Sequence, residues 1–217
     1  MNAFTIRDLE NLTGVRAHTI RIWEQRYGFL RPQRTDTNIR YYNNEELKKI
    51  LNVSLLNKYG YKISRINQMS DREIHEKLLT LSQAEAVQEK IINDLIQYMV
   101  DIDMDSFEKV IDQQIRIRGI EKTILDIIFP YMERIGVLWL TSHIHPVQEH
   151  LVTNIIRQKL LVGTEALSTA LPNAKLGVLF LPEGEFHELG LLYMHYLLKF
   201  NVIRVYYLGA NVPVNDI

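Results

Sequence analysis

The sequence contains no cysteine, which removes disulfide bonds, thiolate metal ligands and thiol catalysis from consideration. It also has no apolar run of eighteen or more residues, so a membrane-spanning helix is not expected. The start of the chain, Met1 to Thr5, lacks the basic region and apolar core of a signal peptide. These absences together predict a cytoplasmic protein that does not enter a membrane.

The composition is that of a globular protein, with 47% hydrophobic and 24% charged residues in a chain long enough for two or three small domains. The net charge of -1 hides an uneven distribution. Residues 1–70 hold 12 Lys and Arg against 6 Asp and Glu, whereas residues 71–217 hold 13 against 20. A basic head on an acidic body suggests that the head binds a polyanion, although charge alone does not exclude chance patterning.

The first domain begins with two short predicted helices. Residues 5–12 place apolar side chains on one helical face, and Thr5 is suited to cap that helix. Thr13 and Gly14 then break the helix, and a second helix is expected from Val15. This pattern predicts a helix-turn-helix whose second helix fits a DNA major groove. We expect that helix to bury Ile20 and Trp23 and to expose Arg16, His18, Thr19 and Arg21.

Residues 26–42 are too rich in glycine, proline and asparagine for a helix, and they predict a small hairpin around residues 36–38. The segment contains four arginines and three tyrosines, which suit contacts with the phosphate and sugar backbone of DNA. A third helix is expected from Asn44, which can cap it, and Gly60 should end it. Residues 63–69 then begin another helix.

These motifs together resemble the MerR family of winged helix-turn-helix regulators. The resemblance rests on Thr13-Gly14-Val15, Thr19-Ile20-Arg21, Trp23-Glu24, Tyr27-Gly28, Leu30-x-Pro32-x-Arg34 and Asn38-Ile39-Arg40-Tyr41-Tyr42. It implies that the partner is a double-stranded DNA operator. It further implies that Arg21, Arg40 and Tyr42 contact the phosphate backbone. Under the same resemblance, Arg16, His18 and Thr19 lie nearest the bases.

The middle of the chain predicts four helices. Ser70 to Glu73 form a helix-start pattern, and the polar stretch that follows is interpreted as a linker. Helical periodicity returns from Glu85, breaks at residues 101–103, and continues over residues 120–137 and 146–167. Four antiparallel helices with short connections predict a bundle.

Histidines and a glutamate gather between the last two of these helices. Trp139 is followed by His143, His145, Glu149 and His150. Adjacent helical residues point about 100° apart, so Glu149 and His150 do not give the one-face geometry of a zinc helix. Taken alone, the cluster is compatible with a surface loop that carries incidental histidines.

The spacing of Trp139, Glu149 and His150 resembles the W-x9-E-H signature of the helical bundle in CarH/LitR-type cobalamin-binding photoreceptor repressors. The resemblance implies that these three residues cap the upper face of adenosylcobalamin and shield its deoxyadenosyl group. Some light-responsive relatives have histidine directly after the signature tryptophan, where this chain has Leu140. His143 or His145 are the candidates to replace it, and a response to light is therefore left open.

The last segment predicts a strand at residues 176–181, a helix at 189–200 and a strand at 202–208, which is the opening of a doubly wound α/β sheet. In the loop after the first strand, Glu185-x-His187-x-x-Gly190 resembles the E/D-x-H-x-x-G cobalamin motif. The resemblance implies that His187 is the lower axial ligand of cobalt and that Glu185 orients its other ring nitrogen. Because the chain ends at Ile217, the sheet is expected to be truncated.

The sequence thus predicts a multidomain protein. Residues 1–72 form an α-helical winged helix-turn-helix, residues 80–170 a four-helix bundle, and residues 174–217 the first part of a Rossmann-like cobalamin-binding domain. The predicted function is a non-enzymatic, homo-oligomeric transcriptional repressor controlled by adenosylcobalamin, whose cobalt His187 would bind, with a response to light left open. Two alternatives remain: a MerR-type regulator whose body senses another ligand or only oligomerises, and a cobalamin-dependent methyltransferase or mutase component.

Overall fold

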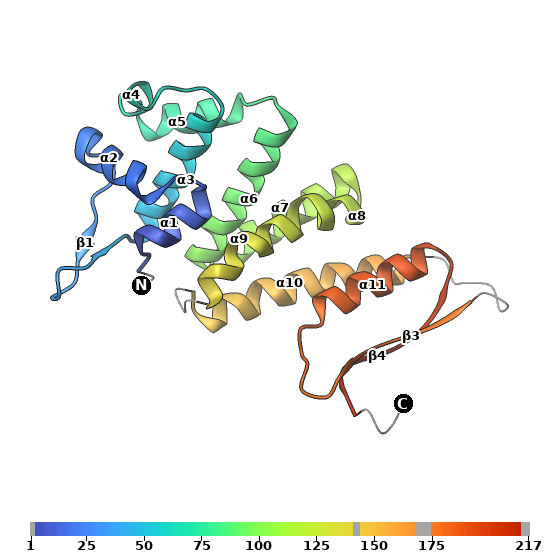
Figure 1. Cartoon of the computed structure of the whole chain (residues 1–217). Coiled ribbons are helices and arrows are strands. Elements are labelled where there is room, and N and C mark those ends of the chain that lie inside the picture. Colours follow the sequence, from blue (N-terminus) through green and yellow to red (C-terminus); the bar gives the residue numbers. More distant parts are fainter. Residues whose placement is uncertain (1–2, 141–143, 168–174, 214–217) are drawn as a thin grey trace. The chain divides into compact units, whose positions relative to one another are not determined.

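The computed structural model describes residues 3–140, 144–167 and 175–213, apart from the side chains of residues 137, 139 and 140. The chain divides into two compact units, residues 1–149 and residues 150–217. Figure 1 shows the order of the elements along the chain. The domain bounds expected from the sequence stay predictions, because this division separates two units and not three.

The first unit begins with helices α1 (Ile6–Thr13) and α2 (Ala17–Tyr27), which confirms the two predicted helices. Thr5 and Asp8 form a capping box at the start of α1: the Thr5 backbone N–H donates to Asp8 Oδ2 over 2.6 Å. Gly14 ends α1 at φ +70°, a left-handed conformation that glycine adopts without strain. The chain therefore turns sharply between α1 and α2, as a helix-turn-helix requires.

The predicted hairpin is confirmed as two short antiparallel strands, β1 (Gln33–Arg34) and β2 (Arg40–Tyr41). Tyr42, directly after β2, forms an antiparallel β-bridge with Phe4. Each residue donates its N–H to the other's carbonyl, over 2.8 and 2.9 Å. The base of the hairpin is thereby attached to the segment that precedes α1. Figure 1 shows the hairpin extending beside α2.

Helices α3 (Asn44–Lys58), α4 (Ile63–Ile66) and α5 (Asp71–Leu79) follow. Asn43, and not the predicted Asn44, caps α3, because its side-chain oxygen accepts the N–H of Glu46 over 3.0 Å. The interpretation of the stretch after Ser70 as a linker is wrong. It forms α5, whose Ile74 and Leu78 lie one turn apart and are buried, and α5 packs against α3.

The helices of the body begin with α6 (Ala84–Asp101) and α7 (Met104–Arg118). The predicted helix at residues 120–137 is one continuous helical stretch: α8 (Ile120–Thr123), a π-helical turn η1 (Ile124–Ile128) and α9 (Phe129–Leu140). The buried rings of Phe107 on α7 and Tyr131 on α9 pack edge to face with centroids 5.6 Å apart. The Tyr131 hydroxyl also lies 3.1 Å from the sulfur of Met99, so this contact joins α6, α7 and α9.

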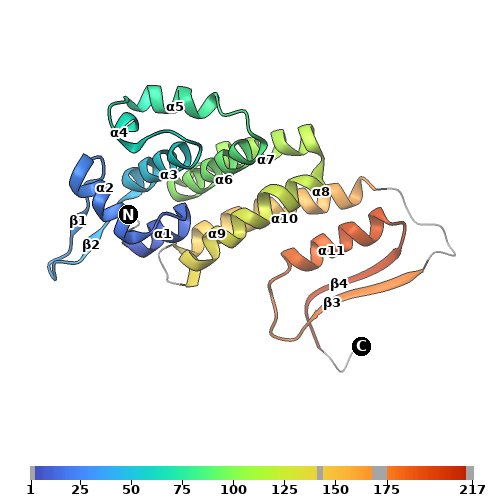
Figure 2. The same cartoon turned by 45° about the horizontal axis from the view of Figure 1, so that its top comes forward.

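Helix α10 (Pro146–Glu165) starts in the first unit and continues into the second, where β3 (Leu176–Pro182), α11 (Leu189–Phe200) and β4 (Arg204–Val212) follow. The two strands are parallel, with Leu176 opposite Arg204 and Val178 opposite Tyr206, and α11 packs on them. Figure 2 shows this strand–helix–strand unit, which confirms the predicted elements at the end of the chain. Among the described residues, no helix is long and apolar enough to cross a membrane.

Candidate functional site

The predicted DNA-binding residues of α2 lie on its solvent side. Arg16, His18 and Arg21 are exposed and Thr19 is half-buried, whereas the opposite face carries the buried Ile20 and Trp23. Trp23 packs on the ring of Phe29 with centroids 6.1 Å apart, which fixes α2 against the core. The structure therefore leaves the polar face of α2 accessible to a partner.

Glu24 connects α2 to the hairpin. Its side chain is 11% exposed, and its two oxygens contact different residues of the hairpin segment. Oε1 lies 3.7 Å from Nε of Arg40, and Oε2 accepts the hydroxyl of Tyr42 over 3.2 Å. No motif of the sequence assigns a role to Glu24. The available signal was an acidic residue directly after Trp23, within the most basic segment of the chain.

The phosphate contact expected for Tyr42 stays a prediction, although the burial of its side chain speaks against it. The side chain of Tyr42 is 0% exposed, so its hydroxyl cannot reach a phosphate on a partner. Burial, together with the nearby Glu24 carboxylate, raises the pKa of the Tyr42 phenol, which therefore stays a neutral donor to Glu24. Arg40 keeps a 38% exposed side chain, so the prediction for that residue stays open. In the structure, Tyr42 attaches the base of the hairpin to Glu24 of α2 and to Phe4.

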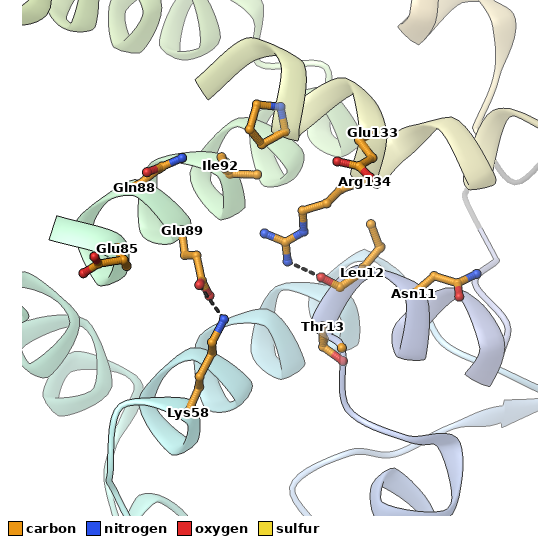
Figure 3. A pocket seen from close by; sticks show the side chains of 12 residues that line it. Asn11, Leu12, Thr13, Lys58, Glu85, Gln88, Glu89, Ile92, Glu133 and Arg134 are labelled. Atoms are coloured by element: carbon orange, nitrogen blue, oxygen red, sulfur yellow. Dashed lines mark hydrogen bonds and ion pairs between the residues drawn. The ribbon is translucent and has the colours of Figure 1, made fainter. Parts of the chain in front are cut away.

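A pocket of about 470 Å³ opens where α1 and α3 meet α6 and α9 (Figure 3). Across it, the guanidinium of Arg134 donates to the carbonyl of Leu12, at the end of α1. Lys58 at the end of α3 forms an ion pair with Glu89 of α6, with 2.5 Å between Nζ and Oε1. None of the predicted site residues lines this pocket. The Arg134–Leu12 and Lys58–Glu89 contacts across the pocket attach α1 and α3 to helices α9 and α6.

A second junction lies at the end of α6, next to the predicted Glu149. Gln148 is 1% exposed, and its Nε2 donates to the carbonyls of Met99 and Val100 over 3.1 and 3.2 Å. Asn44, at the start of α3, donates to the same Val100 carbonyl over 3.3 Å. Gln148, the neighbour of the predicted Glu149, thus shares the Val100 carbonyl with Asn44 of the basic head.

The predicted cap residues are only partly covered by the structure. Glu149 is half-buried and His150 is exposed, both on α10. The side chain of Trp139 and all of His143 lie outside the described residues, and His145 is exposed. Among the residues that are described, no three His, Asp or Glu side chains gather into a group that could hold a metal ion by themselves.

Glu185 and His187 lie together in the loop after β3. Oε1 of Glu185 is 2.6 Å from Nδ1 of the His187 ring, and the same oxygen accepts the His187 backbone N–H over 2.8 Å. These bonds, from the backbone N–H first and from the ring second, hold the pKa of Glu185 below its usual range. The His187 side chain is 91% exposed. The pairing orients the ring through Nδ1, so Nε2 is the ring nitrogen that could hold a metal.

Two family models match the chain. Residues 4–73 match the MerR HTH family of regulatory proteins, and residues 91–162 match a B12 binding domain. The HTH-type transcriptional repressor CarA of Myxococcus xanthus is 31% identical over 211 residues, which cover 96% of this chain and 68% of that relative. The chain belongs to the MerR family of helix-turn-helix regulators.

Other relatives match either nearly the whole chain or about a third of it. The HTH-type transcriptional repressor CarH of Myxococcus xanthus is 28% identical over 224 residues, which cover 99% of this chain and 73% of that relative. The HTH-type transcriptional regulator MlrA of Escherichia coli K12 is 30% identical over 73 residues, or 34% of this chain and 30% of the relative. This MerR-family protein is therefore a helical, multidomain regulator with a B12-binding domain, and not an enzyme.

Proposed function

We propose that this MerR-family protein is a transcriptional repressor whose binding to operator DNA is controlled by adenosylcobalamin. The observation that carries the proposal is the contact of Glu185 with Nδ1 of His187 in an exposed loop at the carboxyl end of β3. Ligands of open α/β sheets bind at that end of the strands. A basic head in the same chain supplies an output for such a sensor.

For the head, we propose that the hairpin acts as a wing and α2 as the recognition helix. Arg16, His18 and Thr19 would face the bases, and Arg21 and Arg40 would contact phosphates. Their exposure, and the attachment of Arg40 to α2 through Glu24, support this assignment. Neutralising phosphates releases counterions, so we expect affinity for DNA to fall steeply as salt is raised.

The residues present fit a cobalt corrinoid. An exposed imidazole with a carboxylate on its other nitrogen suits a metal ligand, because the carboxylate fixes the orientation of the ring. We propose that His187 would hold the cobalt and that Trp139, Glu149 and His150 would contact the corrinoid. Adenosylcobalamin, when bound, would supply a cobalt–carbon bond that light can cleave.

For the architecture, we propose that α6, α7, α9 and α10 act as a four-helix cap, and that β3, α11 and β4 begin a Rossmann-like sheet. The arrangement of α6, α7 and α9 around Phe107 and Tyr131 supports the first part. The parallel pairing of β3 with β4 supports the second. We further propose a homo-oligomer, because several linked heads on one operator raise their effective concentration.

The test is a gel-shift titration of operator-containing promoter DNA with the protein in the dark, without and with adenosylcobalamin, and again after illumination. We expect dark adenosylcobalamin to tighten DNA binding and illumination to reverse the effect. Hydroxocobalamin serves as the control corrinoid, since it has no adenosyl group to lose. Equal DNA affinity in all arms would contradict control by cobalamin. If adenosylcobalamin changes the affinity but illumination does not, only the response to light is contradicted.

A further inference from the structure

The loop that carries Glu185 and His187 is attached to β4 at two points. At one end, the Gly184 N–H donates to Oδ1 of Asn211 over 2.9 Å, and the Asn211 N–H donates to the Glu185 carbonyl over 3.2 Å. At the other end stands Glu188, the residue directly after His187. The histidine therefore lies between two anchors, and the second is formed by a side chain that no motif above assigns to a role.

Glu188 occupies the N-cap position of α11, yet its side chain forms no cap hydrogen bond. It turns instead to two other elements. Oε1 accepts the hydroxyl of Tyr207 on β4 over 2.7 Å, and Oε2 lies 3.0 Å from Nε of Arg157 on α10. Each carboxylate oxygen thus has a different partner, which fixes both the position and the plane of the group.

The surroundings of Glu188 make this more than a surface ion pair. Arg157 is 47% exposed, and a pair of that exposure alone contributes little. Glu188, however, is only 19% exposed, and the Tyr207 hydroxyl contact is partly buried. Tyr207 is itself held by a stacked contact with the ring of His195 on α11, with centroids 4.9 Å apart. The anchor is therefore tied to packed side chains on α11 and β4.

We propose that Glu188, through Tyr207 and Arg157, is a positioning residue for His187. The proposal rests on the function proposed above, in which His187 is the axial ligand of a corrinoid. Glu185 sets the rotation of the imidazole, whereas Glu188 sets where the backbone of residue 187 lies relative to β4 and α10. Ligands must be held within a few tenths of an ångström for a metal bond, so an unanchored loop would present the same histidine less often.

The experiment is electron paramagnetic resonance of the full chain loaded with cob(II)alamin, prepared by reducing hydroxocobalamin. Coupling of the unpaired electron to an axial nitrogen splits the signal. Protein carrying histidine labelled with the heavy nitrogen isotope changes that splitting only where histidine is the ligand. The fraction of corrinoid with histidine coupling reports ligation directly. A general loss of stability would not change this fraction in the molecules that remain folded.

We expect Glu188→Ala to lose histidine coupling in most of the bound corrinoid and to weaken corrinoid affinity about tenfold, the lower end for a residue that supports a metal ligand. Glu188→Gln keeps an acceptor for Tyr207 but loses the ion pair, so an intermediate fraction is expected. Tyr207→Phe removes the hydroxyl that Glu188 accepts, so we expect an intermediate fraction of histidine coupling, as in Glu188→Gln. Glu183→Ala is the matched control, because Glu183 is an exposed glutamate of the same loop.

Full histidine coupling in both Glu188→Ala and Tyr207→Phe would overturn the positioning role while leaving the proposed function intact. Absence of corrinoid or of histidine coupling in the unaltered protein would instead overturn the assignment of His187, and with it the proposed function. If circular dichroism shows that Glu188→Ala does not fold, Tyr207→Phe decides the question. A loss of coupling equal in Glu183→Ala would also count against a specific role for Glu188.

Discussion

The α2–hairpin region and the loop after β3 use a carboxylate in the same way but present different residues to the outside. Glu24 binds Tyr42 and Arg40, and Glu185 binds His187. Tyr42 is completely buried, whereas the His187 side chain is 91% exposed. A motif residue held by a carboxylate can therefore be part of the scaffold or part of the site. Burial, and not the motif, distinguishes the two roles.

The largest expected effect tests Tyr42 as part of the core. Tyr42→Ala should lower the free energy of unfolding by about 3–5 kcal/mol, as for other buried aromatic side chains, because it leaves a cavity beside Glu24 and Phe4. Urea denaturation followed by circular dichroism measures the change. Ile39→Ala, at a 61% exposed position of the same hairpin, is the control and should change stability by less than about 0.5 kcal/mol. If Tyr42→Ala leaves stability unchanged but abolishes DNA binding, Tyr42 contacts DNA and is not needed for the core.

The corresponding test for the loop is His187→Ala. We expect corrinoid affinity to fall about 100-fold, equivalent to ~2.7 kcal/mol, with little change in unfolding because the side chain is exposed. Absorbance titration with hydroxocobalamin measures the affinity. His145→Ala replaces another exposed histidine and should bind as the unaltered protein does. Equal losses in the two variants would remove the distinction between His187 and an incidental histidine.

A smaller effect is expected on the exposed side of α2. Arg21→Ala should reduce the slope of log affinity against log salt by about 1 and weaken DNA binding roughly tenfold near ~0.1 M salt, because one phosphate contact is lost. Fluorescence anisotropy at several salt concentrations gives both quantities. Arg116→Ala, an exposed arginine of α7, is the control. An unchanged salt slope for Arg21→Ala would show that this arginine does not pair with a phosphate.

The smallest effect concerns the carboxylate that joins α2 to the hairpin. Glu24→Gln keeps an acceptor for the Tyr42 hydroxyl and loses only the charge opposite Arg40. We expect the free energy of unfolding to fall by less than about 1 kcal/mol, since the Arg40 contact is long and partly exposed. Tyr42→Phe removes the hydroxyl itself and should cost about 1 kcal/mol by the same denaturation measurement. A larger cost for Glu24→Gln than for Tyr42→Phe would make the ion pair the stronger link.

The helices and strands were largely predictable, because each is marked by local chemistry. Thr5 and Asp8 form the capping box of α1, and Gly14 takes the left-handed conformation that ends it. The two errors, α5 and the cap of α3, are also local in origin. A nine-residue helix with only two buried side chains has a weak periodicity, and two adjacent asparagines are equally good caps by sequence.

The candidate site was predictable only in part. The resemblance of Glu185-x-His187 to the cobalamin motif made their contact expected, and the structure has it at 2.6 Å. Glu24 and Glu188 could not be assigned in the same way. Their partners Tyr42 and Tyr207 lie 18 and 19 residues away, and only the pairing of strands and helices brings them together.

The sequence by itself determined the order of helices and strands, the basic character of the head, and the residue types available for DNA and for a metal ligand. These properties follow from side-chain periodicity, caps and charge, which act over a few residues. Only the tertiary structure decided which of those residues face solvent and which carboxylates hold them. Exposure and long-range hydrogen bonds depend on the packing of distant segments, so Tyr42 became core, His187 stayed at the surface, and Glu188 gained a role next to it.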